Sequence, residues 1–334
     1  MAGYTVVVLP GDGIGPEIVD ATRTVLAATG VEIEWKPFEV GIAAMEMTGT
    51  PLPDEAVEEI RRCGVALKGP ITTPVGSGFA SATVALRQRL DLYANLRPVR
   101  SIPGVPARYP AVDLVIIREN TEDLYAGVEH WIDDDTVIAV KRITRQASQR
   151  IARFAFDYAT RHHRRQVTAV HKANILKMSD GLFLQCAREV AGQYPHLKYS
   201  ERIVDALCLD LVLDPGRHDV LLCPNLYGDI VSDLAAGLVG GLGLAPAANI
   251  GDGVAVFEAV HGSAPDIAGK GIANPTALIL AGAMMLAYLG ETEAAARVEK
   301  AVLETYRQGK ALTPDMGGTA TTREFTRAIV ACMD

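Results

Sequence analysis

Short apolar segments alternate with helical patterns along this chain, and this alternation limits the folds open to it more than any other feature. The strand-like segments each run into polar or glycine-rich residues; they are Val65–Lys68, Leu114–Ile117, Val167–Val170 and Val220–Leu222. Segments with helical periodicity lie between them, such as Ala147–Arg161 and Asp180–Tyr194. Buried strands separated by helices are typical of α/β proteins. The length of 334 residues suits two domains or one large α/β unit.

A glycine-rich turn follows the first strand, in the stretch "VVVLPGDGIGPEIV". The dinucleotide-binding fingerprint needs glycine at the first, third and sixth positions of such a turn. Gly11 and Gly13 satisfy the first two positions, but Pro16 occupies the sixth. Proline fits the first turn of a helix, because the N–H that it lacks would have no intrahelical partner there. The spacing therefore predicts a tight strand-to-helix turn, with the main site of any dinucleotide elsewhere.

The bulk composition argues against several classes of protein. A net charge of -8 provides no general attraction for nucleic acid. The five cysteines are scattered without a C-x-x-C pair, which predicts reduced thiols in a cytoplasmic protein, with neither disulfides nor a zinc site. A strand that begins at Thr5 argues against a signal peptide. The longest apolar run, Ala277–Gly290, is too short to cross a bilayer and predicts a buried helix, so we expect no membrane partner.

Basic residues follow or flank several of the predicted strands. Arg87 and Arg97 flank a helix-to-strand passage, and Arg118 comes directly after a buried strand. Each arginine alone would be expected to form a structural salt bridge. Together they indicate an anion pocket, because guanidinium groups bind carboxylates bidentately. Lys172 lies just past the strand Val167–Val170 and is a candidate general base; the alternative is a solvated lysine in a turn.

Two aspartates in "NLYGDIVSDLAAGL" have helical spacing. Asp229 and Asp233 are four residues apart, so both carboxylates lie on one face of a helix. Like charges in this arrangement destabilise a helix unless a cation or solvent compensates them. With Asp205 as a third ligand, the pair would suit Mg²⁺ or Mn²⁺, which prefer oxygen ligands.

The segment "EAVHGSAPDIAGKGIANPTA" predicts a long loop that begins near Glu258. Long loops rich in glycine and small residues are more often functional than not. Its backbone N–H groups are suited to phosphates, and Asp266 to ribose hydroxyls. Asn274 and Pro275 are expected to be the N-cap and first residue of the following helix.

A hairpin arm is predicted within Gly127–Ile143, with its turn at Asp133–Asp135. Arms of this kind often pair between subunits. The proline-rich segment Arg97–Pro110 predicts a crossover between domains.

Taken together, these segments resemble the β-decarboxylating dehydrogenases, which include isocitrate, homoisocitrate and 3-isopropylmalate dehydrogenases. The resemblance runs nearly end to end and is carried by "GDGIGPE", "LDLYANLRP", "RENTEDLYAG", "HKANILKMSDGLF", "PNLYGDIVSDLAAGLVGGLG", "HGSAPDIAGKGIANP" and "TPDMGGTATTREF". It implies a two-domain α/β fold with a large mixed sheet flanked by helices, which is not a Rossmann fold. The implied large domain comprises residues 1–98 and 241–334. The implied small dimerisation domain comprises residues 99–240, with an arm near 124–145.

Several positions resemble NAD-dependent isocitrate dehydrogenase more than the other members. "LKGPITTPVGSG" followed by Ser81 matches the isocitrate enzymes, although Thr83 stands where they usually have asparagine. NADP-dependent relatives carry a Lys-Tyr pair where this chain has Asp266-Ile267, which implies NAD, since a carboxylate repels a 2′-phosphate. Homoisocitrate and other 3-substituted D-malates stay open as substrates. A non-catalytic regulatory subunit is a further alternative, although Tyr125, Lys172 and the three aspartates are all present.

The resemblance also implies a role for each site residue in the oxidative decarboxylation of isocitrate to 2-oxoglutarate and CO₂. Lys172 takes up the C2 hydroxyl proton, hydride passes from C2 to NAD, and Tyr125 protonates C3 after CO₂ leaves. The substrate carboxylates are bound by Ser81, Thr83, Arg87, Arg97 and Arg118. Mg²⁺ or Mn²⁺ is bound by Asp205, Asp229 and Asp233. NAD is bound by Thr72, His261, Gly262, Ser263, Ala264, Pro265, Asp266, Ile267 and Asn274. The resemblance implies a homodimer or higher homo-oligomer, with Lys172 and Asp205 serving the site of the neighbouring subunit.

Overall fold

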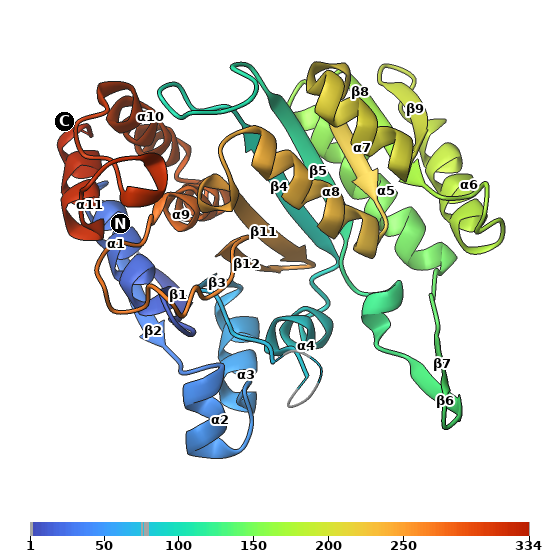
Figure 1. Cartoon of the computed structure of the whole chain (residues 1–334), viewed down its shortest axis with the longest axis horizontal. Helices are drawn as coiled ribbons and strands as arrows, with labels where there is room; N and C mark the ends of the chain where they lie inside the picture. The colour runs from blue at the N-terminus through green and yellow to red at the C-terminus, as the bar shows by residue number, and fades with distance from the viewer. Residues whose placement is uncertain (1–2, 75, 77–79, 334) are drawn as a thin grey trace. The chain divides into compact units, whose positions relative to one another are not determined.

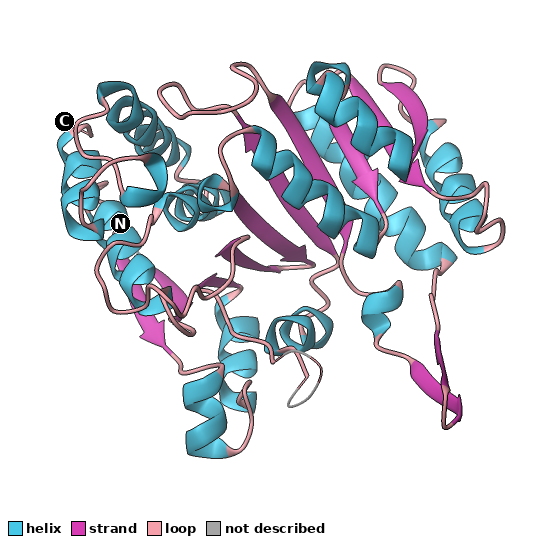
Figure 2. Ribbon diagram, viewed as in Figure 1, coloured by secondary structure: helices cyan, strands magenta, loops and turns pink. Residues whose placement is uncertain are grey.

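The computed structural model describes residues 3–74, 76 and 80–333. The chain folds into two compact units, of which the first comprises residues 1–90, 101–110 and 239–334, and the second residues 91–100 and 111–238. Each unit is an α/β structure with its own strands and helices (Figures 1 and 2). The expected α/β class is therefore confirmed.

The first unit contains strands in the order β2-β1-β3-β12-β11. Within the sheet, the neighbouring strands β2, β1, β3 and β12 pair in parallel, and β11 pairs antiparallel with β12. The strands are β1 (Tyr4–Leu9), β2 (Ile33–Pro37), β3 (Val65–Lys68), β11 (Pro246–Gly251) and β12 (Val254–Ala259). The helices are α1 (Gly15–Ala27), α2 (Ile42–Thr48), α3 (Asp54–Cys63), α4 (Ala82–Arg89), α9 (Thr276–Tyr288), α10 (Thr292–Gln308) and α11 (Thr322–Ala331).

The second unit contains strands in the order β4-β5-β10-β8-β9. Strand β4 runs antiparallel to β5, and the remaining neighbours pair in parallel, so this part of the sheet is also mixed. The strands are β4 (Ala94–Arg100), β5 (Asp113–Glu119), β8 (Gln166–His171), β9 (Lys198–Ile203) and β10 (Val220–Cys223). The helices are α5 (Arg145–Arg161), α6 (Ser179–Ala191), α7 (Val204–Leu213) and α8 (Asn225–Leu238).

Most predicted elements are present with small changes at their ends. The four predicted buried strands correspond to β3, β5, β8 and β10, and the two helical patterns to α5 and α6. The predicted cap of the helix that follows the long loop is off by one residue. Pro275 is the N-cap and α9 begins at Thr276, but the Asn274 side chain still accepts a hydrogen bond from the Thr276 N–H at 3.0 Å. Helix α9 is largely buried, and no helix in the described ranges is long and apolar enough to cross a membrane.

The predicted tight turn at the start of the chain is confirmed, with Pro16 in the first turn of α1. Its glycines are required by close backbone contacts. A Cβ atom on Gly11 would lie 2.1 Å from the carbonyl oxygen of Pro70, and one on Gly13 would lie 2.0 Å from that of Ser263. Both glycines also have positive φ, of 72° and 59°, a conformation that side chains disfavour. The turn therefore packs closely against the loops that contain Pro70 and Ser263.

The predicted hairpin is formed by β6 (Glu129–Asp133) and β7 (Thr136–Ala139), which pair antiparallel. All of its residues are exposed. Trp131 and Ile132 are 71% and 62% exposed. Apolar side chains gathered on an exposed element mark an interaction surface.

Candidate functional site

The residues predicted to bind substrate, metal and cofactor fall on both units. Tyr125, Lys172, Arg97, Arg118 and the three aspartates belong to the second unit, and the remaining residues belong to the first.

In the second unit, Arg118 lies at the end of β5 and is held by α8. Its guanidinium donates to the Asn225 side-chain oxygen from Nε at 2.9 Å and from Nη2 at 2.7 Å, and it forms an ion pair with Asp229. The Tyr125 hydroxyl donates to the same carboxylate, and the guanidinium lies 4.8 Å from the centre of the Tyr125 ring. The predicted substrate-binding arginine, metal ligand and proton donor are therefore in direct contact.

A second arginine joins this group from β4. Arg97 Nε donates to the Asn95 side chain at 2.7 Å, and Nη1 donates to the Ser232 hydroxyl at 2.5 Å. Its guanidinium lies 3.4 Å from Asp229 and 3.6 Å from Asp233. The two aspartates share one face of α8, as predicted, and the positive charge of Arg97 reduces their mutual repulsion.

The electrostatics of this group favour a protonated tyrosine. Burial raises the pKa of Tyr125, and its hydrogen bond to Asp229 raises that pKa further. Tyr125 therefore keeps its proton near neutral pH and is able to donate it. Burial also raises the pKa of Asp233, an effect that Arg97 opposes.

Gly228 allows Arg118 to lie directly against α8. A Cβ atom at this position would lie 2.6 Å from Cγ and 2.7 Å from Cβ of Arg118. Arg118 is 1% exposed, so it has little room to move away. The motif "NLYGD" thus contains both Asp229, which pairs with Arg118, and Gly228, which leaves space for the Arg118 side chain. The sequence analysis did not predict this role of Gly228.

Lys172 follows β8 and forms an ion pair with Asp205, in the first turn of α7. The hydrogen bond from Lys172 holds the pKa of Asp205 below its usual value. The Lys172 backbone N–H donates to the fully buried Asp180 at 2.6 Å, and Asp180 also accepts from Lys141 at 2.6 Å. Among the residues that the structure describes, no group of three or more His, Cys, Asp or Glu side chains is arranged to hold a metal ion.

In the first unit, Arg87 belongs to a buried charge network that the sequence analysis did not predict. Glu258 accepts from Arg87 at 2.9 Å, from Lys68 at 2.7 Å and from the Asn249 side chain at 2.7 Å. Lys68, Arg87 and Glu258 are 2%, 7% and 4% exposed. The two cations hold the pKa of Glu258 well below its usual range, against the opposing effect of burial. Two buried cations share one carboxylate, which leaves an excess positive charge.

Ser81 and Thr83 lie at the start of α4, close to Arg87 in sequence. Ser81 is the N-cap of this helix and accepts from the Val84 N–H at 3.4 Å, while the Thr73 hydroxyl donates to it at 3.2 Å. Part of the motif "LKGPITTPVGSG", namely residues 75 and 77–78, lies outside the described residues.

The predicted cofactor loop borders a pocket of about 450 Å³ in the first unit. Five of the predicted residues line it: His261, Gly262, Ala264, Ile267 and Asn274. The predicted Pro265 and Asp266 are exposed on the same loop and are not among the lining residues.

Hydrogen bonds hold both ends of this loop. The Ser263 hydroxyl lies 2.7 Å from that of Thr72, and the Ser263 carbonyl accepts from the Ile14 N–H at 2.9 Å. The Asn274 side chain donates to Asp315 at 2.9 Å. The loop therefore has a fixed path beside the opening glycine turn.

His261 is neutral in this pocket. Burial lowers its pKa, and Nδ1 lies 2.9 Å from the Gly262 carbonyl oxygen. Since a carbonyl only accepts, Nδ1 carries the proton and Nε2 is an acceptor. Within the described ranges Nε2 is buried without a hydrogen-bond partner, which leaves it available to a ligand.

The chain is similar to known enzymes along nearly its whole length. A family model described as isocitrate/isopropylmalate dehydrogenase matches residues 5–329. Isocitrate dehydrogenase (NAD) catalytic subunit 5, mitochondrial, of Arabidopsis thaliana is 54% identical over 326 residues, which cover 97% of this chain and 87% of that protein. The human mitochondrial isocitrate dehydrogenase (NAD) subunit alpha is 52% identical, over 97% of this chain and 89% of that protein. The crystal structure of isocitrate dehydrogenase from Methylococcus capsulatus has a TM-score of 0.97 and 53% identity, and the match covers 99% of each chain.

These comparisons correct one expectation and bear out another. The expected cytoplasmic location is wrong by this comparison, since the Arabidopsis, Drosophila and human relatives are all named as mitochondrial. Reduced cysteines suit any reducing compartment, so their pattern could not tell one such compartment from another. The resemblance in the sequence motifs is confirmed: the chain belongs to the isocitrate/isopropylmalate dehydrogenase family.

Proposed function

We propose that this protein catalyses the NAD-dependent oxidative decarboxylation of isocitrate to 2-oxoglutarate and CO₂, with Mg²⁺ or Mn²⁺. The observation that carries the proposal is the contact of Arg97, Arg118 and Tyr125 with Asp229. Relatives named as NAD isocitrate dehydrogenases support the substrate and the cofactor.

The arginines supply the positive charge that a substrate with several carboxylates requires. Arg97 and Arg118 are nearly buried and fixed by side-chain hydrogen bonds, so little entropy is lost when they bind a carboxylate. Arg87 shares its buried carboxylate with Lys68. The excess positive charge there suits the distal carboxylate, next to Ser81 and Thr83.

The residues present fit a divalent cation. Asp229 and Asp233 offer carboxylate oxygens from one helix face, and Asp205 of the neighbouring subunit would be the third ligand. Hard oxygen ligands suit Mg²⁺ and Mn²⁺. When bound, the metal would polarise the substrate oxygen at C2 and NAD would accept the hydride.

Two side chains of the protein carry protons in the proposed reaction. Tyr125 is protonated near neutral pH, because burial and Asp229 raise its pKa, so it is suited to protonate C3. Lys172 would accept the C2 hydroxyl proton, and Asp180 fixes its backbone.

NAD would bind at the pocket lined by His261 and Ile267. The apolar side chain of Ile267 suits contact with an adenine ring, and the neighbouring Asp266 would accept from ribose hydroxyls while it repels a 2′-phosphate.

We further propose a homodimer in which each subunit completes the site of the other. The exposed apolar side chains of the β6–β7 hairpin support an interface between subunits. The relatives are named as subunits, so the composition of the assembly needs a direct measurement by light scattering of the purified chain.

The test is steady-state NADH formation with Mg²⁺ or Mn²⁺, comparing isocitrate, homoisocitrate, 3-isopropylmalate and D-malate, with NADP as the control cofactor. We expect kcat/KM for isocitrate to exceed the others at least tenfold and activity to vanish with a metal chelator. A preference for homoisocitrate would refute the substrate, and no turnover of any compound would favour a regulatory subunit.

A further inference from the structure

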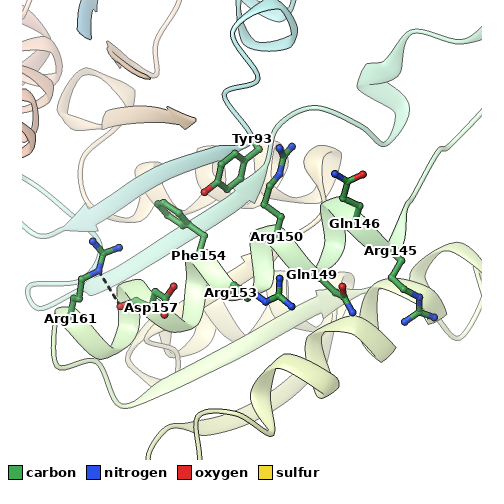
Figure 3. A pocket seen from close by; sticks show the side chains of 9 residues that line it. All are labelled: Tyr93, Arg145, Gln146, Gln149, Arg150, Arg153, Phe154, Asp157 and Arg161. Carbon is green, nitrogen blue, oxygen red and sulfur yellow. Dashed lines mark hydrogen bonds between the residues drawn. The ribbon is translucent and has the colours of Figure 1, made fainter. Parts of the chain in front are cut away.

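Helix α5 borders a second pocket, in the second unit, and none of the residues that line it is among those predicted to bind isocitrate, NAD or metal. Its volume is about 780 Å³ (Figure 3), within the range of small-molecule sites. Its lining includes Arg145, Arg150, Arg153 and Arg161 of α5 and Tyr93, which precedes β4. The chain as a whole has a net charge of -8, whereas α5 carries these four arginines against one aspartate.

Two of the four arginines form ion pairs, and the other two have no carboxylate partner among the residues that the structure describes. Arg145 pairs with Glu189 at 3.3 Å, and Arg150 pairs with Asp91 at 2.5 Å. In the described part of the chain, Arg153 and Arg161 form no ion pair. The one aspartate of the helix, Asp157, accepts from the Tyr194 hydroxyl at 2.7 Å, and Arg161 reaches only its backbone oxygen, at 3.4 Å.

Asp91 offsets the charge of Arg150, whereas within the described residues no carboxylate offsets that of Arg153 or Arg161. Arg150 and Arg153 are three residues apart on α5, where like charges lie on neighbouring positions and destabilise a helix. An anion bound between the guanidinium groups would remove this repulsion and would accept charge-assisted hydrogen bonds.

The spacing of the unpaired arginines determines the shape of that anion. Arg153 and Arg161 are eight residues apart on α5, so about 12 Å of helix axis separates them. A single phosphate is too small to meet both guanidinium groups in their helical positions. We propose that this pocket binds an extended polyphosphate anion, with its charge distributed along α5.

The pocket also offers an aromatic wall. The rings of Tyr93 and Phe154 meet edge to face with their centres 6.1 Å apart, and the Arg150 guanidinium lies 4.2 Å from the centre of the Tyr93 ring (Figure 3). Aromatic and guanidinium groups together suit a flat ring joined to phosphates. The polyphosphate is therefore either inorganic or part of a nucleotide.

The first experiment is titration calorimetry of the full chain with inorganic tripolyphosphate, without metal and with saturating NAD, so that the cofactor pocket is filled. The test variant is Arg153→Gln with Arg161→Gln. The control is Arg217→Gln, because Arg217 is equally a surface arginine, 64% exposed and paired with Asp214 outside the pocket. Circular dichroism and the melting temperature of each variant report whether it folds as the wild type does.

We expect the wild type and the Arg217→Gln variant to bind alike and the double variant to bind at least tenfold more weakly, with a strong dependence on salt. Absence of binding by the wild type, or equal binding by a folded double variant, would overturn the proposal. Adenosine triphosphate, titrated in parallel, identifies the source. If adenosine triphosphate binds more tightly than tripolyphosphate, and Tyr93→Leu removes that difference, the ligand is a nucleotide. If the two compounds bind equally well, the ligand is an inorganic polyphosphate.

Discussion

Substitution of Gly228 tests whether close packing against α8 positions Arg118, the arginine that we propose binds substrate. In Gly228→Ala, the new Cβ would lie 2.6 Å from Arg118 Cγ. Carbon atoms in contact are normally about 3.5–4.0 Å apart, so Arg118 must move by about 1 Å. A displacement of this size at a binding group costs about 10²-fold in rate.

The effect on stability should be smaller than the effect on activity. Overpacking costs about 1–3 kcal/mol, but alanine is favoured over glycine inside a helix by about 1 kcal/mol, so the net loss is at most about 2 kcal/mol. The assay is kcat/KM for isocitrate from NADH formation, together with the free energy of unfolding in urea. Gly237→Ala is the matched control, since Gly237 lies on the same helix with nothing within 4 Å of its added Cβ. A folded Gly228→Ala enzyme with wild-type kcat/KM would refute the role of this contact.

Three further predictions concern the assembly, the buried network and pH. The Tyr125→Phe and Lys172→Met variants should each be inactive alone, but mixing and refolding them together should restore about a quarter of wild-type activity. About half of the dimers would then be hybrids, and one of the two sites in each hybrid would have both residues intact. Continued inactivity would mean that Tyr125 and Lys172 of the same chain serve one site. Glu258→Gln should destabilise the protein by about 3–5 kcal/mol in urea unfolding, since Lys68 and Arg87 lose their shared buried carboxylate; the exposed Glu293→Gln is the control, and equal stability of the two variants would contradict the prediction. Burial raises the pKa of Glu122 from 4.5 to about 7, so the folded state binds this proton more tightly than the unfolded state, and the resulting stability should be lost as pH rises from 4.5 to about 7. Glu122→Gln should flatten that part of the unfolding profile, and an unchanged slope would argue against a neutral buried carboxyl group.

The sequence was informative wherever a local pattern determined the structure. The strands at Val65–Lys68 and Val220–Cys223 are fully buried and follow from their apolar runs. Asp229 and Asp233 share a helix face because helical geometry brings residues four apart together. The helix after the long loop was predicted one residue too early, because Asn274 makes its capping hydrogen bond from outside the helix, with Pro275 between them.

The buried network of Lys68, Glu258 and Arg87 could not be predicted, because it depends on the order of strands in the sheet. Lys68 ends β3 and Glu258 lies near the end of β12, and the two residues are register partners across parallel strands. These strands are separated by most of the chain. A charged residue at the end of each buried strand was visible in "VALK" and "VAVFEA", but no local signal shows that β3 and β12 are neighbours.

The glycines of the turn after β1 nearly match the dinucleotide-binding fingerprint, although close backbone packing explains why they are needed. Gly11, Gly13 and Gly15 each face a carbonyl oxygen that would lie 2.0–2.1 Å from an added Cβ. One of these oxygens belongs to Ser263, in the loop proposed to bind NAD, and the same oxygen accepts from the Ile14 N–H. A larger residue at position 13 would therefore displace this loop. Close backbone contacts therefore require the glycines here, and Pro16 at the sixth position fits the first turn of α1, because the N–H that it lacks would have no intrahelical partner there.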